Sequence, residues 1–254
     1  MKKFFGAITI VIVCLSVVSL FASIVTAQNS NSWPMFQNDL AHTGYSTAKA
    51  PSSNQTLWTF TTNKEVWSSP VVVNGIVYVG SYDHNVYALN ATTGMKIWAF
   101  STGGEIIASP AVANGIVYIG SNDNKIYALN AENGALIWNY TTGNEVEGSP
   151  TVSGGVVYVG SNDYNLYALN AVNGTLVWNF TTGGDVISCP AISNGVLYFG
   201  SYDIKVYALD AATGTLKWSY KTGGVVESSP VVANGMVYIP VSYTHLTLPT
   251  IYSV

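Results

Sequence analysis

A tryptophan recurs every 40 residues through most of this chain, with no insertion or deletion between its copies. The five copies are Trp58, Trp98, Trp138, Trp178 and Trp218. Four aspartates keep the same interval: Asp83, Asp123, Asp163 and Asp203. A fixed period of this length indicates one supersecondary unit repeated in tandem, each copy burying a face against the next. A residue present in every copy is therefore expected to maintain the unit rather than to perform chemistry.

Each repeat reads as four short strands. In the copy that spans residues 68–102, runs of β-branched and aromatic residues predict strands over 69–73, 76–81, 86–90 and 95–101. Asn74-Gly75 joins the first two runs, and both residues tolerate the positive φ of a two-residue hairpin turn. Four short antiparallel strands per 40 residues predict a β-propeller blade. The expected fold is all-β, with four complete blades and additional partial ones.

The fourth strand of each repeat carries the recurring tryptophan. Leu136, Trp138 and Tyr140 are expected to share one face of the strand, while Ile137 and Asn139 point the other way. The face that carries Trp138 is expected to be buried against the neighbouring blade. The five tryptophans are predicted to be structural docking residues that join the blades. A glycine interrupts each second strand, where a neighbouring group must approach closely. These glycines are Gly80, Gly120, Gly160 and Gly200.

The chain begins with two lysines and an uncharged apolar run that ends in small residues at Ala27. This pattern predicts a secretory signal over residues 1–27, with an uncleaved membrane anchor as the alternative. We expect an exported protein of the cell envelope, periplasmic or extracellular. A lead-in segment over 28–56 and propeller repeats over 57–239 follow, and residues 240–254 depart from the repeat.

Composition excludes several classes of function. The chain has no arginine, and without Lys2 and Lys3 seven lysines face 13 acids, a net charge of about −6. Nucleic acid is an unfavourable partner for such a surface, because phosphates require a basic patch. Without the leader, Cys189 is the only cysteine, so no intramolecular disulfide can form. We expect a monomer. The three histidines form no cluster, and no metal site is predicted.

The stretch from Ala88 to Trp98 resembles the tryptophan-docking motif of pyrroloquinoline-quinone-like (PQQ-like) propeller repeats. The motif recurs in register, at 128–138, 168–178 and 208–218, and the segment from Trp33 to Gly44 is similar to the lead-in before the first blade of such proteins. The resemblance covers roughly residues 33 to 239 and implies a β-propeller.

The same resemblance implies less about function. The quinone-dependent dehydrogenases of the family hold their cofactor with adjacent cysteines, an arginine and ligands to calcium. This sequence has neither adjacent cysteines nor arginine, so we expect no enzyme and no cofactor. Other members are non-catalytic envelope proteins, among them the propeller lipoprotein of the outer-membrane β-barrel assembly machine. The leading hypothesis is a binding or scaffold module. The alternatives are a fragment of a quinone- and calcium-dependent dehydrogenase and a carbohydrate-binding surface protein.

The repeat breaks inside its last copy. After Ile239 the pattern calls for Gly-Ser-x-Asp, and Pro240 begins an unrelated tail instead. The tail resembles translated sequencing-adapter read-through, and a genuine divergent closing segment is the alternative. The pieces are four complete blades, an isolated fourth strand predicted over 57–62 and two strands of a last blade. The resemblance implies closure with seven or eight blades, so we expect a truncated propeller. The alternative is five blades, if the early strand completes the last blade and the tail supplies its missing third strand.

Alternation of the strands places the loop before each first strand and the turn after each second strand on one end of the blades. Four loop carboxylates fall there: Glu65, Glu105, Glu145 and Asp185. We predict that they form a partner face for a protein or a surface glycan. The turn aspartates share this end, but aspartate commonly caps its own turn, so their role is expected to be structural. None of the five Asn-x-Thr glycosylation sequons lies on this face.

Overall fold

The computed structural model describes residues 32–47, 52–241 and 252–253, and every regular element in them is a β-strand. Blade 1 contains β1 (Val71–Val73), β2 (Ile76–Gly80), β3 (Asn85–Asn90) and β4 (Lys96–Ser101). Blade 2 contains β5 (Ala111–Ala113), β6 (Ile116–Ser121), β7 (Lys125–Asn130) and β8 (Leu136–Thr141). Blade 3 contains β9 (Thr151–Ser153), β10 (Val156–Gly160), β11 (Asn165–Asn170) and β12 (Leu176–Thr181). Blade 4 contains β13 (Ala191–Ser193), β14 (Val196–Ser201), β15 (Lys205–Asp210) and β16 (Leu216–Lys221).

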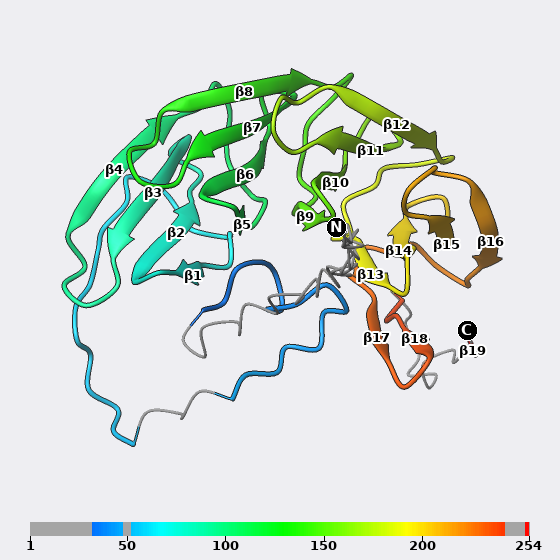
Figure 1. Cartoon of the computed structure of the whole chain (residues 1–254), viewed down its shortest axis with the longest axis horizontal. Helices are drawn as coiled ribbons and strands as arrows, with labels where there is room; N and C mark the ends of the chain where they lie inside the picture. The colour runs from blue at the N-terminus through cyan, green and yellow to red at the C-terminus, as the bar shows by residue number, and fades with distance from the viewer. Residues whose placement is uncertain (1–31, 48–51, 242–251, 254) are drawn as a thin grey trace, which may run out of the picture.

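A fifth sheet has three strands, β17 (Val231–Ala233), β18 (Met236–Tyr238) and β19 (Tyr252–Ser253), and is called blade 5 below. All sheets are antiparallel, and in each blade the strands pair in chain order. The blades follow one another around an arc, with the short first strands toward the centre and the long fourth strands outside (Figure 1). The predicted all-β propeller of four-stranded blades is therefore confirmed.

Local sequence explains the strand ends. Asn74 and Gly75 both have positive φ, 53° and 75°, which is the two-residue hairpin geometry expected of Asn-Gly. A β-bulge between the third and fourth strands, at Ala128/Leu129 in blade 2, offsets Leu136 from the alternation. The prediction that Leu136 shares a buried face with Trp138 was consequently wrong, since Leu136 is 46% exposed. The first strands are also shorter than predicted and begin two residues later.

The recurring tryptophans lie between adjacent blades. The indole nitrogen of Trp138 donates a 3.0 Å hydrogen bond to the carbonyl of Ala171 in the next blade, and its ring lies against Gly174. Trp58, Trp98 and Trp178 make the equivalent bonds to Ala91, Ala131 and Ala211 at 2.9, 2.9 and 3.2 Å. Trp218 is half-buried and packs near Val206, Val226 and Ile239. The indoles of Trp98, Trp138 and Trp178 thus combine apolar burial with one oriented hydrogen bond, which fixes the spacing of neighbouring blades.

The second-strand glycines are required where the blades meet. A Cβ on Gly160 would lie 2.1 Å from the carbonyl oxygen of Val186, and one on Gly80 would lie 2.3 Å from the Ile106 side chain. Equivalent contacts surround Gly120 and Gly200. The close approach predicted from the sequence is confirmed at all four positions.

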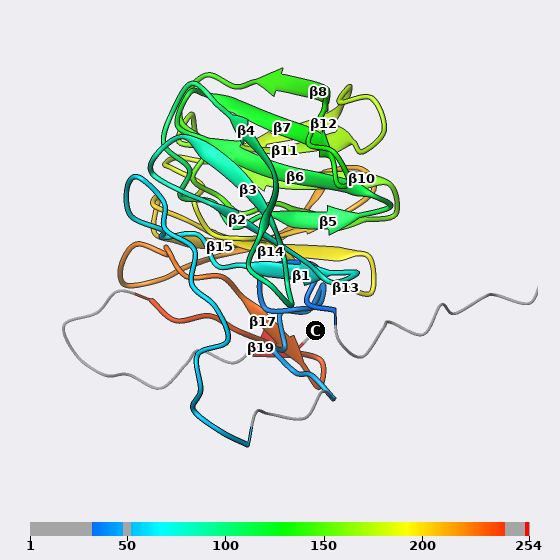
Figure 2. The same ribbon diagram turned by 90° about the vertical axis from the view of Figure 1, so that its left-hand side faces the viewer.

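The first described part of the lead-in segment, residues 33–41, lies along the inner strands of the arc, and this blue trace passes near β1 and β17 (Figures 1 and 2). Trp33 pairs with Val72 of β1 through two backbone hydrogen bonds, of 2.6 and 2.9 Å. The carbonyls of Pro34, Leu40 and Ala41 then accept from Val112 of β5, Ile192 of β13 and Val232 of β17. This segment therefore satisfies inner-strand amides of four blades, a role that the sequence did not reveal.

The structure bears on the predictions made for the segments before and after the complete blades. Residues 57–62, predicted to be an isolated fourth strand, are extended but are not a β-strand in the structure. Trp58 and Phe60 nevertheless pack against Val79, Tyr87 and Leu89, where the fourth strand of a preceding blade would lie. The predicted leader over 1–27 and most of the tail lie outside the described residues. Within the described residues, there is no helix long and apolar enough to cross a membrane.

Candidate functional site

The four loop carboxylates lie at one end of the blades, each fixed to the turn of its own blade. The backbone carbonyl of Glu65 accepts a 2.9 Å hydrogen bond from the amide of Tyr82, and that of Asp185 accepts one from Tyr202. Glu105 and Glu145 make the same bond with Asn122 and Asn162. Their carboxylates take no part in these bonds; the side chain of Glu65 is exposed, and those of Glu105, Glu145 and Asp185 are partly exposed. We call these four residues, with Glu147 and Glu227, the acidic face.

The sequence pattern did not reveal Glu147 and Glu227, because their repeat position holds an acid in only two of the five copies. They occupy the position two residues after the loop carboxylates, which holds Trp67, Ile107, Glu147, Ile187 and Glu227 in the five copies. A position that varies between copies is not needed to build the blade, and this variation is the signal that marks it. Among these residues Trp67 is 68% exposed, a large aromatic surface facing solvent.

Electrostatic interactions show that acids from several blades converge. The pKa of Glu147 is raised, mainly by burial. A hydrogen bond with Asn162 lowers this pKa, and the charges of the nearby Glu145 and Asp185 carboxylates raise it. Burial also raises the pKa of Tyr82, with contributions from Glu105, Glu147 and Glu65. The face therefore concentrates negative charge.

At the other side of the face, Tyr202 donates a 2.8 Å hydrogen bond to Glu227. Burial, this bond and the charges of Glu227, Glu147 and Asp185 raise the pKa of Tyr202 to about 12. Glu147 thus interacts with tyrosines of blades 1 and 4. The acidic face is one electrostatic surface spread over five blades, not five separate loops.

An aromatic pair borders the acidic face on blade 1. The rings of Trp67 and Tyr82 lie 5.2 Å apart between centroids and are tilted by 56°. On the same face, Lys64 forms an ion pair with Glu105 at 3.2 Å, with both side chains partly exposed. An exposed ion pair of this kind contributes little stability and exchanges readily with another cation.

The turn aspartates have structural partners, as their recurrence suggested. Asp163 accepts from the amides of Asn165, in its own turn, and Gly143, in the loop that leaves the preceding blade, at 3.1 and 2.6 Å. The hydroxyl of Tyr167 donates to the same carboxylate at 2.7 Å. Asp83, Asp123 and Asp203 have the corresponding tyrosine and loop-amide partners. The aspartates therefore cap their own turns, as expected, and also bond to the loop that precedes the blade, which was not predicted.

Asp83 should make stability dependent on pH. Burial tends to raise its pKa, but hydrogen bonds from Tyr87, Asn63 and Asn85 outweigh burial, and the pKa falls below its usual 3.8. A carboxyl whose folded pKa is lowered stabilises the fold above its unfolded pKa and loses that contribution as the pH falls through the folded value. Asp83→Asn should therefore be less stable than the parent at neutral pH, and the difference should shrink below pH 3.8.

Urea midpoints across the acid range measure this difference. Glu132→Gln, at an exposed turn on the opposite end, is the matched control and should follow the parent at every pH. A difference between Asp83→Asn and the parent that stayed constant with pH would contradict the assignment.

Cys189 and His42 meet in the core, where the Sγ and Nε2 atoms are 3.5 Å apart. Burial raises the pKa of the Cys189 thiol to about 12, and burial lowers the pKa of His42. Both groups are neutral, so the pair is not an activated thiolate. The His42 Nδ1 atom bonds to the carbonyl of Pro230 at 3.0 Å, and the pair anchors the lead-in segment to blades 4 and 5.

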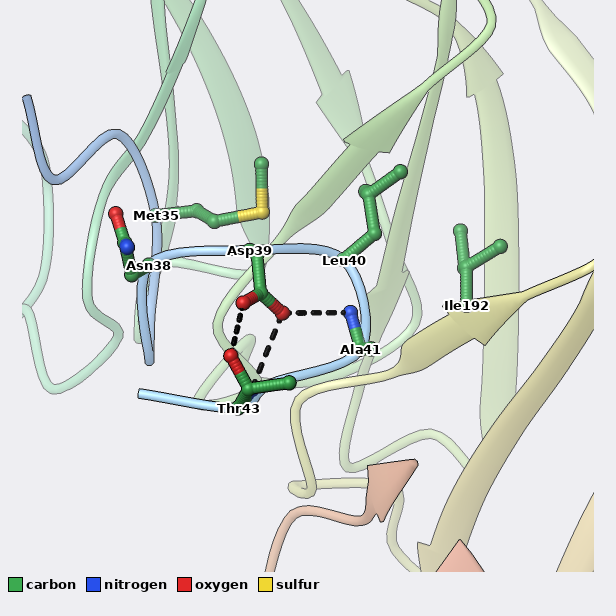
Figure 3. A pocket seen from close by; sticks show the side chains of 7 residues that line it. All are labelled: Met35, Asn38, Asp39, Leu40, Ala41, Thr43 and Ile192. Atoms are coloured by element: carbon green, nitrogen blue, oxygen red, sulfur yellow. Dashed lines mark hydrogen bonds between the residues drawn. The ribbon is translucent and has the colours of Figure 1, made fainter. Parts of the chain in front are cut away.

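A hollow of about 420 Å³ lies between the lead-in segment and β13 (Figure 3). Met35, Leu40 and Ile192 form its apolar wall. Asp39 lies at its edge, but its carboxylate accepts from the amides of Ala41 and Thr43 and from the Thr43 hydroxyl. Asp39 therefore caps its own loop. Among the described residues, no group of three His, Cys, Asp or Glu side chains could hold a metal ion.

The family model described as outer membrane protein assembly factor BamB matches residues 42–107, 83–188 and 181–247, which together cover most of the chain. The chain belongs to this family of PQQ-like propeller repeat proteins. No curated protein sequence matches it significantly.

Solved structures share the fold. BamB from Moraxella catarrhalis aligns with a TM-score of 0.64 at 20% identity, over 71% of this chain and 60% of that one. Quinohemoprotein alcohol dehydrogenase from Comamonas testosteroni aligns with a TM-score of 0.71 at 20% identity, over 82% and 47%. A europium-containing methanol dehydrogenase gives 0.69 at 17% identity, over 88% and 54%. At these identities the likeness shows the fold alone, and the alignments span about half to three fifths of each larger protein.

The residues present do not fit a quinone cofactor of the kind that the resemblance implies. The chain has no arginine and no adjacent cysteines, and Cys189 is buried and already bonded within the core. The described carboxylates are either bonded within turns or spread along the acidic face, without a group of three potential metal ligands.

Proposed function

We propose that this chain is a non-catalytic binding module of the cell envelope, and that its acidic face docks a cationic segment of a protein partner. The observation that carries the proposal is the convergence of carboxylates from blades 1 to 5 around Tyr82 and Tyr202. A face lined by one sign of charge attracts the opposite charge and accelerates its association.

The Trp67–Tyr82 pair gives this face an anchor. Protein interfaces concentrate binding energy in a few aromatic and charged residues, and tryptophan and tyrosine are prominent among them. An ammonium group over an aromatic ring gains an electrostatic attraction that the surrounding carboxylates reinforce. A lysine of the partner could therefore displace Lys64 from Glu105 and lie against the rings.

The envelope location rests on the secretory signal predicted over residues 1–27 and on the family. The matching family model is described as outer membrane protein assembly factor BamB. The surface also suits an exported protein, since it depends on Asn, Thr and Ser rather than on charge. A protein that binds a partner through one face needs no catalytic group there.

Charge reversal tests the proposal. Binding of a fluorescein-labelled lysine-rich peptide is followed by anisotropy for the parent and for Glu105→Lys with Glu145→Lys. We expect the double variant to bind at least about tenfold more weakly, because two attractive charges become repulsive. The affinity of the parent should also fall with added salt, since the carboxylates are exposed to solvent.

Glu132→Lys is the matched control, because it reverses one charge at an exposed turn on the opposite end of the blades. It should leave the affinity unchanged. Equal affinities for the parent and the double variant would dismiss the acidic face as the binding surface.

A dehydrogenase fragment is the competing function, and the fold shared with the alcohol dehydrogenases favours it. Spectroscopic titration with pyrroloquinoline quinone and calcium separates the two functions, and saturable binding would reverse the ranking. A carbohydrate partner is the third outcome. In that case a neutral oligosaccharide would bind in place of the lysine-rich peptide, with little dependence on salt.

A further inference from the structure

Each interface between complete blades contains a carbonyl that accepts two hydrogen bonds. The carbonyl of Ala171, just after β11, accepts from the indole of Trp138 at 3.0 Å and from the hydroxyl of Tyr118 at 3.1 Å. The two rings lie 5.9 Å apart. Ala131 receives the same pair from Trp98 and Tyr78, and Ala211 receives it from Trp178 and Tyr158.

Tyr198 is the fourth copy of this tyrosine, and it lacks the acceptor. Its side chain is 0% exposed, and its ring lies 5.9 Å from that of Trp218, as in the other copies. Its hydroxyl has no hydrogen-bond partner, although the hydroxyls of Tyr78, Tyr118 and Tyr158 each have one. The corresponding acceptor would come from residue 251, which lies outside the described residues. A buried hydroxyl without a partner is unfavourable and is rare in folded proteins.

In the complete blades the acceptor follows the third strand, which pairs with the second in one fixed register. Val196 of β14 pairs with Asp210 of β15, immediately before Ala211. In blade 5 the corresponding Met236 of β18 pairs with Ser253, three residues beyond the position that the repeat predicts. The pairing with β19 covers only Met236 and Val237. The edge of β18 is therefore paired briefly and out of the register of the repeat.

We propose that the edge of β18, together with the Tyr198 hydroxyl, is a docking site for the third strand of a further PQQ-like repeat. The strand would add antiparallel to β18 and would carry the pattern Tyr-Ala-Leu-Asx-Ala. The carbonyl of its last alanine would accept from Tyr198, as the carbonyl of Ala211 accepts from Tyr158. This is strand addition at a sheet edge, in which the added strand would replace the two-residue pairing with β19; backbone bonds would supply affinity and a buried side chain would fix the register.

A peptide of this chain's own sequence tests the proposal. A fluorescein-labelled peptide with the sequence of residues 125–134, which contains β7 and Ala131, is titrated with the full chain and followed by anisotropy. We expect saturable binding, and a peptide with proline at the position of Ala128 should not bind because proline removes a ladder donor. Tyr198→Phe should weaken binding about fivefold, the contribution of one hydrogen bond. Absence of binding, or equal binding by Tyr198→Phe, would overturn the proposal.

Stability without peptide gives a second test. Tyr158→Phe removes a hydroxyl that bonds to Ala211, and its melting temperature should fall by about 2–4 °C. Tyr198→Phe removes a hydroxyl without a partner, so its melting temperature should not fall. Equal losses in the two variants would show that Tyr198 already has an acceptor, and the docking site would be wrong.

Discussion

Replacement of Trp138 by alanine should lower the free energy of unfolding by about 3–5 kcal/mol. Trp138 is 8% exposed and lies between blades 2 and 3, where its ring contacts Gly174 and its indole bonds to Ala171. Alanine would remove this bond and leave a cavity between two sheets that are too rigid to close it. Urea unfolding, followed by far-ultraviolet circular dichroism, measures the loss.

Trp67→Ala is the matched control for this prediction, because the same residue type is removed from a position that is 68% exposed. Its stability should stay within about 0.5 kcal/mol of the parent, as is usual for surface substitutions. A comparable loss at both positions would show that the indoles stabilise the chain in some way other than by packing between blades.

Replacement of Gly160 by alanine should cost about 3 kcal/mol. The added Cβ would lie 2.1 Å from the carbonyl oxygen of Val186 and 2.5 Å from its Cγ1 atom, both in the next blade. The oxygen belongs to the backbone and cannot rotate away, so relief requires a shift of blade 4 relative to blade 3. The midpoint of urea unfolding measures this cost.

Gly154→Asn is the control for the glycine substitution. Gly154 has a positive φ of 57° with open space around it, and asparagine holds the equivalent position with φ near 50° at Asn74, Asn114, Asn194 and Asn234. The variant should be as stable as the parent or slightly more so, since asparagine tolerates this conformation and restricts the unfolded chain. A stable Gly160→Ala variant would contradict the close packing of blades 3 and 4.

The blade itself was predictable because its signals are local. Asn-Gly turns, alternating strands and a tryptophan in constant register each restrict the backbone within a few residues. The second-strand glycines were also interpretable, since a glycine in a strand usually indicates close approach. Predictions failed where the pairing between strands departs from regular alternation or is absent. The bulge beside Leu136 exposes a residue that simple alternation buries, and residues 57–62 lack the strand partner that their sequence implies.

The candidate site was only partly predictable. Glu65, Glu105, Glu145 and Asp185 could be placed at one end of the blades because they recur with the period of the fold. Glu147 and Trp67 occupy a repeat position whose residue type varies between copies, and no local rule shows that they border the same surface. Their proximity depends on how neighbouring blades are arranged around the arc, which is a property of the assembled sheets.

The sequence by itself determined the unit: four antiparallel strands, the turns that join them and an indole that docks on the next copy. These features depend on contacts inside one repeat or between adjacent repeats, and the same residues recur in each copy. Only the tertiary structure decided that Trp33, Pro34, Leu40 and Ala41 satisfy the inner strands of four blades, and that Tyr198 is buried without an acceptor. Both depend on backbone groups that are far apart in the chain. Any residue type can supply a backbone carbonyl, so such hydrogen bonds cannot be predicted from a sequence pattern.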